Sequence, residues 1–130
     1  PRDADLQAKI TAGLYLEAAE TLVRCDPTAV NAYIRSRFKV SVLKGPVTLL
    51  PRLADGCVGT TNFDSAIEEA YKLFSIQFEG YMHGTQNHNF MGRLARGDRC
   101  ILKIHGDASD DPSSFVFTKK QYDKAYGKSF

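Results

Sequence analysis

A short strand that runs directly into an amphipathic helix constrains the fold of this chain more than any other stretch. Residues 57–61 are mostly apolar or β-branched, which predicts a buried parallel strand. The apolar residues downstream recur at intervals of three and four, which is typical of a helix lying on a sheet: Ile67, Ala70, Tyr71, Phe74 and Phe78. A capping box formed by Ser65 and Glu68 predicts that this helix begins at about Asp64 or Ser65. Thr61, Asn62 and Asp64 are then expected to point into the crevice beyond the strand's carboxyl end, where open α/β sheets bind ligands.

Three helices are predicted before this strand. The first is short and ends at Gly13, a residue suited to a left-handed terminator. The second has an apolar stripe at helical spacing: Tyr15, Ala18, Ala19, Leu22 and Val23. Asp26-Pro27 places a capping carboxylate before the third helix, whose inner face is predicted to hold Val30, Tyr33, Ile34 and Phe38. A further short helix is expected over residues 47–53, after the break at Gly45-Pro46.

Beyond the central helix, residues 79–99 show neither helical nor strand periodicity, so we expect a long loop there. Residues 100–104 form a second clear strand, which stops at His105-Gly106-Asp107. A third, short strand is expected over residues 114–118, and Thr118 then caps a closing helix with Tyr122 and Tyr126 facing inward. Helices that alternate with short apolar strands predict an α/β fold with a mostly parallel sheet, in one domain over residues 1–130.

The composition argues against several classes of function. A net charge of +2 and the lack of a Lys or Arg run disfavour direct nucleic-acid binding. No apolar stretch reaches the roughly 20 residues that span a bilayer, and no signal peptide opens the sequence, so we expect a cytoplasmic protein without a membrane partner. Cys25, Cys57 and Cys100 are odd in number and far apart, which predicts small buried side chains and neither a disulfide framework nor a zinc site.

Polar residues follow both clear strands at the point where each strand ends. Thr61, Asn62 and Asp64 come after the first strand, and His105-Gly106-Asp107 comes after the second. The intervening chain is long enough for a crossover helix, so both groups are expected at the same edge of the sheet.

Three motifs in this order resemble the sirtuin-like NAD-hydrolysing domains of bacterial defence proteins, over about residues 14–127. They are T-T-N-F-D leading into I-E-E-A, L-K-I-H-G-D, and V-F-T-x-x-x-Y at Val116–Tyr122. The resemblance implies a Rossmann-like sirtuin-type fold with Asn62 and His105 as the catalytic pair. It further implies that Asp64 helps to hold NAD, together with Thr61, Asn62, His105 and Gly106.

The function implied by this resemblance is hydrolysis of NAD, as a substrate and without a metal, to nicotinamide and ADP-ribose in antiphage defence. A homo-oligomer with a sensor domain or a phage-derived activator is also implied. Cleavage of the nicotinamide bond builds positive character on the ribose, which calls for an oriented polar group and a base that titrates near neutrality. Two alternatives stay open: a module that binds NAD or ADP-ribose without turnover, and an NAD-dependent deacylase, which the missing four-cysteine zinc module disfavours.

The sequence departs from the family in its glycines. No two of the ten glycines are two residues apart, so the turn that cradles dinucleotide phosphates is missing. We therefore expect a fragment whose glycine turn lies upstream of Pro1, and poor binding of NAD by these 130 residues alone.

Each candidate residue also has a purely structural interpretation. Asn62 and Asp64 suit a strand-end cap, and His105 suits a core histidine bonded to the backbone. His83 and His88 are expected as exposed loop histidines and not as metal ligands. Tyr71, Phe74 and Phe78 are expected in the core and not against a nucleobase.

Overall fold

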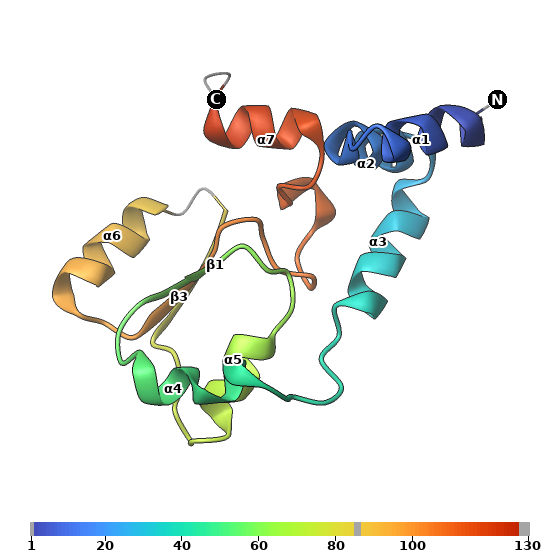
Figure 1. The fold of residues 1–130 in the computed structure, drawn as a ribbon. Helices are drawn as coiled ribbons and strands as arrows, with labels where there is room; N and C mark the ends of the chain where they lie inside the picture. The colour runs from blue at the N-terminus through green and yellow to red at the C-terminus, as the bar shows by residue number, and fades with distance from the viewer. Residues whose placement is uncertain (1, 85–86, 128–130) are drawn as a thin grey trace. The chain divides into compact units, whose positions relative to one another are not determined.

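The computed structural model describes residues 2–84 and 87–127, and the chain divides into two compact units (Figure 1). The helical unit comprises the residues up to Ser36 together with those from Val116 onward, and the sheet unit comprises Arg37–Phe115. The predicted α/β class is confirmed, because the described residues contain seven α-helices and a parallel sheet of three strands.

The helical unit holds α1 (Arg2–Thr11), α2 (Tyr15–Cys25), most of α3 (Pro27–Arg37) and α7 (Lys119–Tyr126). The predicted helix ends are confirmed. Gly13 has φ of +74° and its N–H donates to the Ile10 carbonyl, which closes α1. The Asp26 carboxylate accepts from the Ala29 N–H at 2.9 Å and so caps α3. The predicted inner face of α3 is wrong at Tyr33, which is 64% exposed.

The closing helix α7 begins at the predicted cap. Thr118 and Gln121 form a capping box, in which the Gln121 side chain accepts the N–H groups of Phe117 and Thr118. The strand predicted over residues 114–118 is therefore wrong, since a side chain takes the donors that a strand ladder would need. Residues Pro112–Ser114 form the 3₁₀ turn η2 instead. The inward position predicted for Tyr126 is also wrong: it is 39% exposed, and its ring packs on Tyr122.

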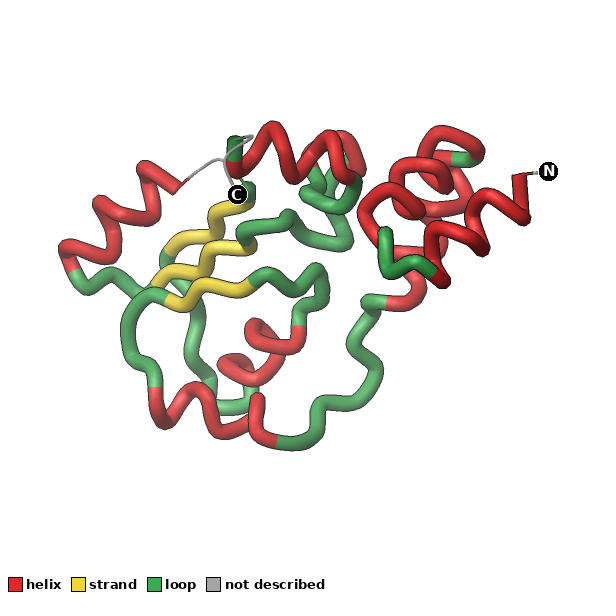
Figure 2. The backbone as a smooth tube through the Cα atoms, turned by 45° about the horizontal axis from the view of Figure 1, so that its top comes forward, coloured by secondary structure: helices red, strands yellow, loops and turns green. Residues whose placement is uncertain are grey.

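The sheet unit is built on three parallel strands that lie side by side in Figure 2. They are β1 (Val58–Thr60), β2 (Gly80–His83) and β3 (Cys100–Lys103), in the order β1-β3-β2. At their carboxyl ends, Thr60 and His83 are both register partners of Lys103. The two strands predicted at residues 57–61 and 100–104 are confirmed, and β3 is the central strand.

Alternation along β3 divides the core of the sheet unit into two faces (Figure 1). On one face Ile101 packs with Val58, Tyr71 and Phe78, under α5 (Ala66–Lys72) and the segment formed by η1 (Pro46–Leu49) and α4 (Leu50–Leu53). On the other face the core residues are Met82, Cys100 and Leu102, which pack against Phe90 of α6 (Asn87–Arg96). Lys103 follows Ile101 by two residues, so its side chain points to the α5 face.

The long loop predicted over residues 79–99 is wrong, because β2 and α6 lie within it. β2 is a four-residue edge strand whose hydrogen bonds come from β3, a pairing that no local periodicity reveals. The central helix is also shorter than predicted. It ends at Lys72 before Ser75, which has φ of +56°, and Phe74 beyond it is 39% exposed.

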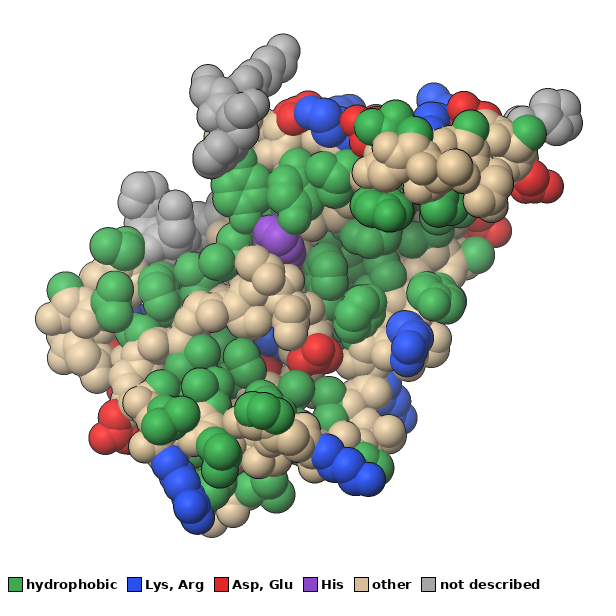
Figure 3. Space-filling model, in the orientation of Figure 1, with side chains coloured by type: hydrophobic (Ala, Val, Ile, Leu, Met, Phe, Trp, Pro, Cys, Tyr) green, Lys and Arg blue, Asp and Glu red, His purple; other side chains and the backbone are tan. Residues whose placement is uncertain are grey.

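The surface matches the near-neutral charge of the sequence. On the face shown in Figure 3, Lys and Arg side chains are scattered among acidic and apolar ones and form no continuous stripe. Across residues 2–84 and 87–127, every helix is too short or too polar to cross a bilayer.

Candidate functional site

The parallel register places both polar motifs at one edge of the sheet. Thr60 ends β1 and is the register partner of Lys103, which ends β3. The ladder continues one step further, since the Ile104 N–H donates to the Thr60 carbonyl at 2.8 Å. The first loop, Thr61–Asp64, and the second loop, Ile104–Asp111, therefore leave adjacent strands together. The expectation that both motifs share an edge is confirmed.

Phe63 joins the two loops. Its carbonyl accepts from the Ala108 N–H at 2.9 Å, and its ring centroid lies 6.5 Å from that of His105. The same ring packs on Phe115 at 5.2 Å and on Phe38 at 5.7 Å. No role was predicted for Phe63. This aromatic cluster holds the backbone between Asn62 and Asp64 against the second loop.

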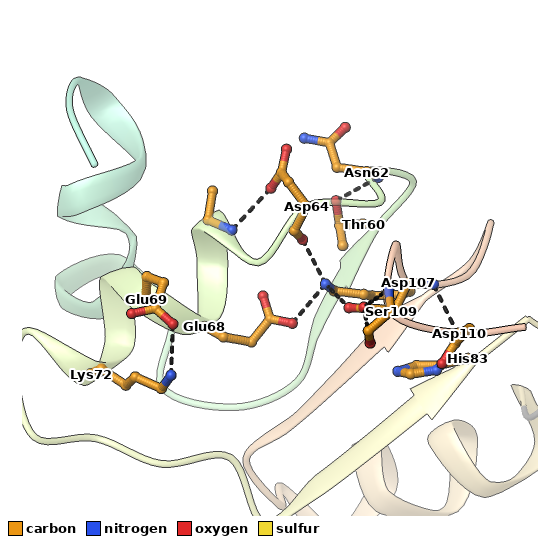
Figure 4. Close-up of polar contacts among 12 residues, drawn as sticks. Thr60, Asn62, Asp64, Glu68, Glu69, Lys72, His83, Asp107, Ser109 and Asp110 are labelled. Carbon is orange, nitrogen blue, oxygen red and sulfur yellow. Dashed lines mark hydrogen bonds and ion pairs between the residues drawn. The ribbon is translucent and has the colours of Figure 1, made fainter. Parts of the chain in front are cut away.

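Thr61 and Asn62 are exposed at the tip of the first loop. The turn is closed by the Thr60 hydroxyl, which accepts from the Asn62 backbone N–H at 3.1 Å. Figure 4 shows the Asn62 amide pointing away from the polar cluster around Glu68 and Asp107. The closing contact thus comes from the threonine side chain, and the Asn62 amide faces solvent, where a ligand can reach it.

His105 and Gly106 begin the second loop. His105 is half-buried, and this burial lowers the pKa of its imidazole below the ordinary 6.5, so the ring is neutral at pH 7. Gly106 is buried with φ of +99°, and a Cβ there would lie 3.1 Å from Cδ1 of Phe115. Only glycine fits this turn without strain.

The start of α5 differs from the predicted capping box. Ser65 is the N-cap residue but makes no side-chain capping bond, while Oδ1 of Asp64 accepts from the Ala66 N–H at 3.0 Å. Glu68 does not reach back to the cap, because its Oε1 binds the ammonium of Lys103 at 2.7 Å. The capping box prediction is therefore wrong. Burying the Lys103 ammonium without a carboxylate would cost more free energy than leaving an exposed N–H at the helix end to water.

Lys103 lies at the centre of this edge and is completely buried. The Asp64 carbonyl lies 2.6 Å from its ammonium nitrogen, and the carboxylates of Glu68 and Asp107 form ion pairs with the same group. Figure 4 labels these three partners. Burial alone would lower the pKa of Lys103, but the two carboxylates outweigh it and raise the pKa above 10.5. We call Lys103, Glu68 and Asp107 the buried triad.

Asp107 extends these contacts into the second loop. Burial raises its pKa, but hydrogen bonds from Lys103 and Ser109 outweigh that effect and hold the pKa below 3.8. Its backbone N–H donates to Oδ2 of Asp110, an oxygen that also lies 2.6 Å from Nδ1 of His83. The expectation of an exposed loop position is wrong for His83, which ends β2 half-buried beside Asp110. The side chain of His88 lies outside what the structure describes.

The triad was not predicted, although the sequence carries one signal for it. Lys103 stands inside the run 100–104, which is otherwise apolar and was predicted to be a buried strand. Lysine is almost never fully buried unless it is paired, so a lysine there implies an acidic partner. Within the described parts of the chain, no cluster of three or more His, Cys, Asp or Glu side chains could hold a metal ion.

Comparison with known families agrees with this geometry. The family model for the SIR2-like domain matches residues 56–130, which is more than half of the chain. The chain therefore belongs to the SIR2-like family, whose members are generally NAD-dependent enzymes. The match begins just before β1 and includes both loops, and the expected sirtuin-like, Rossmann-like fold is confirmed. No curated protein matches the chain.

Proposed function

We propose that the shared edge of β1 and β3 binds NAD and hydrolyses it to nicotinamide and ADP-ribose. The observation that carries the proposal is the register of the sheet, in which Thr60 pairs with Lys103. Because of that register, the loops bearing Asn62 and His105 leave neighbouring parallel strands at the edge where such sheets bind ligands. Membership of a family of generally NAD-dependent enzymes supports the choice of NAD.

The chemistry suits the two side chains. The bond between the ribose C1′ and the nicotinamide nitrogen breaks, and its electron pair leaves with nicotinamide. Water then adds to C1′ and gives up a proton. His105 is neutral at pH 7 because burial lowers its pKa, so it can accept that proton as a general base. The exposed Asn62 amide can orient the water or a ribose hydroxyl.

The remaining candidate residues supply binding groups. Asp64 uses Oδ1 to cap α5, and we assign its other carboxylate oxygen to a hydroxyl of NAD. Thr61 is exposed next to Asn62, and we assign Thr61 and Gly106, which follows His105, to further contacts with NAD. In this proposal Asn62 and His105 act at the bond that breaks, and the other three residues bind NAD.

The resemblance of the three motifs supports the wider context of this activity. We propose that the whole protein depletes NAD in the cytoplasm as an antiphage response. It would act as a homo-oligomer under the control of a sensor domain or a phage-derived activator.

Incubation of the longest native form of the protein with NAD tests the proposed reaction. Release of nicotinamide without any acyl-peptide is the expected result. Saturable binding of NAD or ADP-ribose without products would favour a binding module. Strict dependence on an acyl-lysine peptide would show a deacylase and would contradict simple hydrolysis.

A further inference from the structure

The buried triad connects the two loops of the proposed NAD site. The Lys103 ammonium binds the backbone carbonyl of Asp64 in the first loop and the carboxylate of Asp107 in the second loop. Its third partner, Glu68, comes from α5. One cation thus holds the loop that carries Asn62, the loop that carries His105 and the helix that follows the first loop.

We propose that Lys103 is a positioning residue, which fixes the loop carrying Asn62 relative to the loop carrying His105 for NAD cleavage. This inference rests on the proposed function. Lys103 is completely buried at the end of β3 and does not touch the substrate; it acts through the Asp64 carbonyl and through Asp107. Catalytic groups gain most when they are held within a fraction of an ångström of their working geometry.

The composition of the triad argues against a purely stabilising role. Burying a charged cluster costs several kcal/mol per ion, and apolar residues of similar volume often serve stability as well or better. The cluster here is also incompletely satisfied, because Oε2 of Glu68 is buried and has no hydrogen-bond partner among the described residues. The triad differs from an apolar cluster in one respect: Lys103 binds the Asp64 carbonyl, and an apolar side chain at position 103 could not.

Three variants separate positioning from stability. Lys103→Met keeps the length of the side chain but leaves the two half-buried carboxylates of Glu68 and Asp107 without their cation, so thermal unfolding should occur at a lower temperature. Lys103→Met combined with Glu68→Met removes one of those carboxylates as well and should recover much of that loss. Lys72→Met is the matched control, because Lys72 forms an ion pair of 2.6 Å with Glu69 on the exposed face of α5.

The expected result is that the double variant recovers stability without recovering catalysis. We expect kcat for nicotinamide release to stay about 10- to 100-fold below that of the unaltered protein, the scale of a positional error in an active site, with a smaller change in KM. Amide hydrogen exchange at residues 61–64 should be faster in the double variant than in the unaltered protein, because the Asp64 carbonyl has lost its tether. Lys72→Met should change neither kcat nor exchange at these residues.

Two outcomes would overturn the inference. If kcat returns together with stability in the double variant, Lys103 serves only the fold. If exchange at residues 61–64 is unchanged, Lys103 does not hold the first loop. Failure of the unaltered protein to release nicotinamide would contradict the proposed function instead, and hydrogen exchange, which needs no substrate, would then decide the role of Lys103.

Discussion

The two loops at the carboxyl edge of the sheet lie next to each other but are built in opposite ways. In the first loop, Thr61 and Asn62 are exposed, and the turn is closed by one bond from the Asn62 N–H to the Thr60 hydroxyl. In the second loop, Gly106 is buried and Asp107 accepts hydrogen bonds from Lys103 and from both the backbone and the side chain of Ser109. The first loop therefore presents exposed side chains to solvent. The second loop, from Gly106 onward, is a hydrogen-bonded turn with a buried glycine.

This contrast separates the exposed side chains of the first loop, which we assign to the reaction, from the buried turn at Gly106, which serves the fold. An exposed side chain contributes little to folding, so its removal should change the reaction and leave the fold intact. A buried turn with a constrained backbone should respond in the opposite way.

Asn62→Ala should reduce the rate of nicotinamide release by about 10²- to 10⁴-fold, the range typical for loss of a group that acts in proton transfer or orientation. The melting temperature should change little, because Asn62 is exposed. Asn89→Ala, at an exposed position on α6, is a matched control that should affect neither quantity. A folded Asn62→Ala variant with the turnover of the unaltered protein would contradict the assignment of this loop to catalysis.

Gly106→Ala should lower the free energy of unfolding by roughly 1–3 kcal/mol, the cost of a non-glycine residue in a strained backbone region. The added Cβ would also lie 3.1 Å from Cδ1 of Phe115. Denaturant unfolding measures the effect. Gly59→Ala is the control, because a Cβ at Gly59 meets nothing within 4 Å. Equal stability losses in the two variants would show that the second loop is less constrained than its geometry indicates.

The pH dependence of kcat/KM should show an acidic limb that belongs to His105. General-base action requires the neutral imidazole, and burial lowers the pKa of His105 below 6.5. The rate should therefore reach a plateau as the pH rises above that lowered pKa and fall about tenfold per pH unit once the pH is below it. A limb centred well above 6.5, or an unchanged limb in the residual activity of His105→Ala, would assign the base to another group.

Asp64→Ala should destabilise the protein by about 0.5–2 kcal/mol, because Oδ1 of Asp64 caps α5. Asp64→Ser should keep most of that stability, since a serine hydroxyl can accept the same N–H. Both variants should lose affinity for NAD, which calorimetry measures. If serine restores affinity together with stability, Asp64 is only a cap and the first loop contributes fewer ligand contacts than we propose.

Local signals predicted the parts of the fold that are organised by near neighbours in the sequence. The strands at residues 58–60 and 100–103 correspond to short apolar runs, and the turn after the first strand corresponds to a polar stretch. The caps at Asp26 and Thr118 were also predicted, because each is completed within three residues. The shared edge of the two motifs followed from the general geometry of parallel sheets.

The features that could not be predicted, β2 and the partner of Glu68, depend on contacts between residues that are distant in the sequence. β2 has the composition Gly-Tyr-Met-His, which lacks a strand pattern, and it becomes a strand by pairing with β3. Glu68 fits a capping box by its spacing, but Lys103 lies 2.7 Å away in the folded chain and takes its carboxylate instead. The triad could therefore be suspected from a lysine in an apolar run, whereas the identity of its partners required the fold.

The combined variant Asn62→Ala/His105→Ala tests whether the two loops form one catalytic site. Nicotinamide release should be measured for the unaltered protein, for each single variant and for the double variant. Residues that act as one unit are strongly non-additive, so the double variant should lose no more activity than the more impaired single variant. Losses that multiply in the double variant, or full turnover in either single variant, would show that Asn62 and His105 do not act together on NAD.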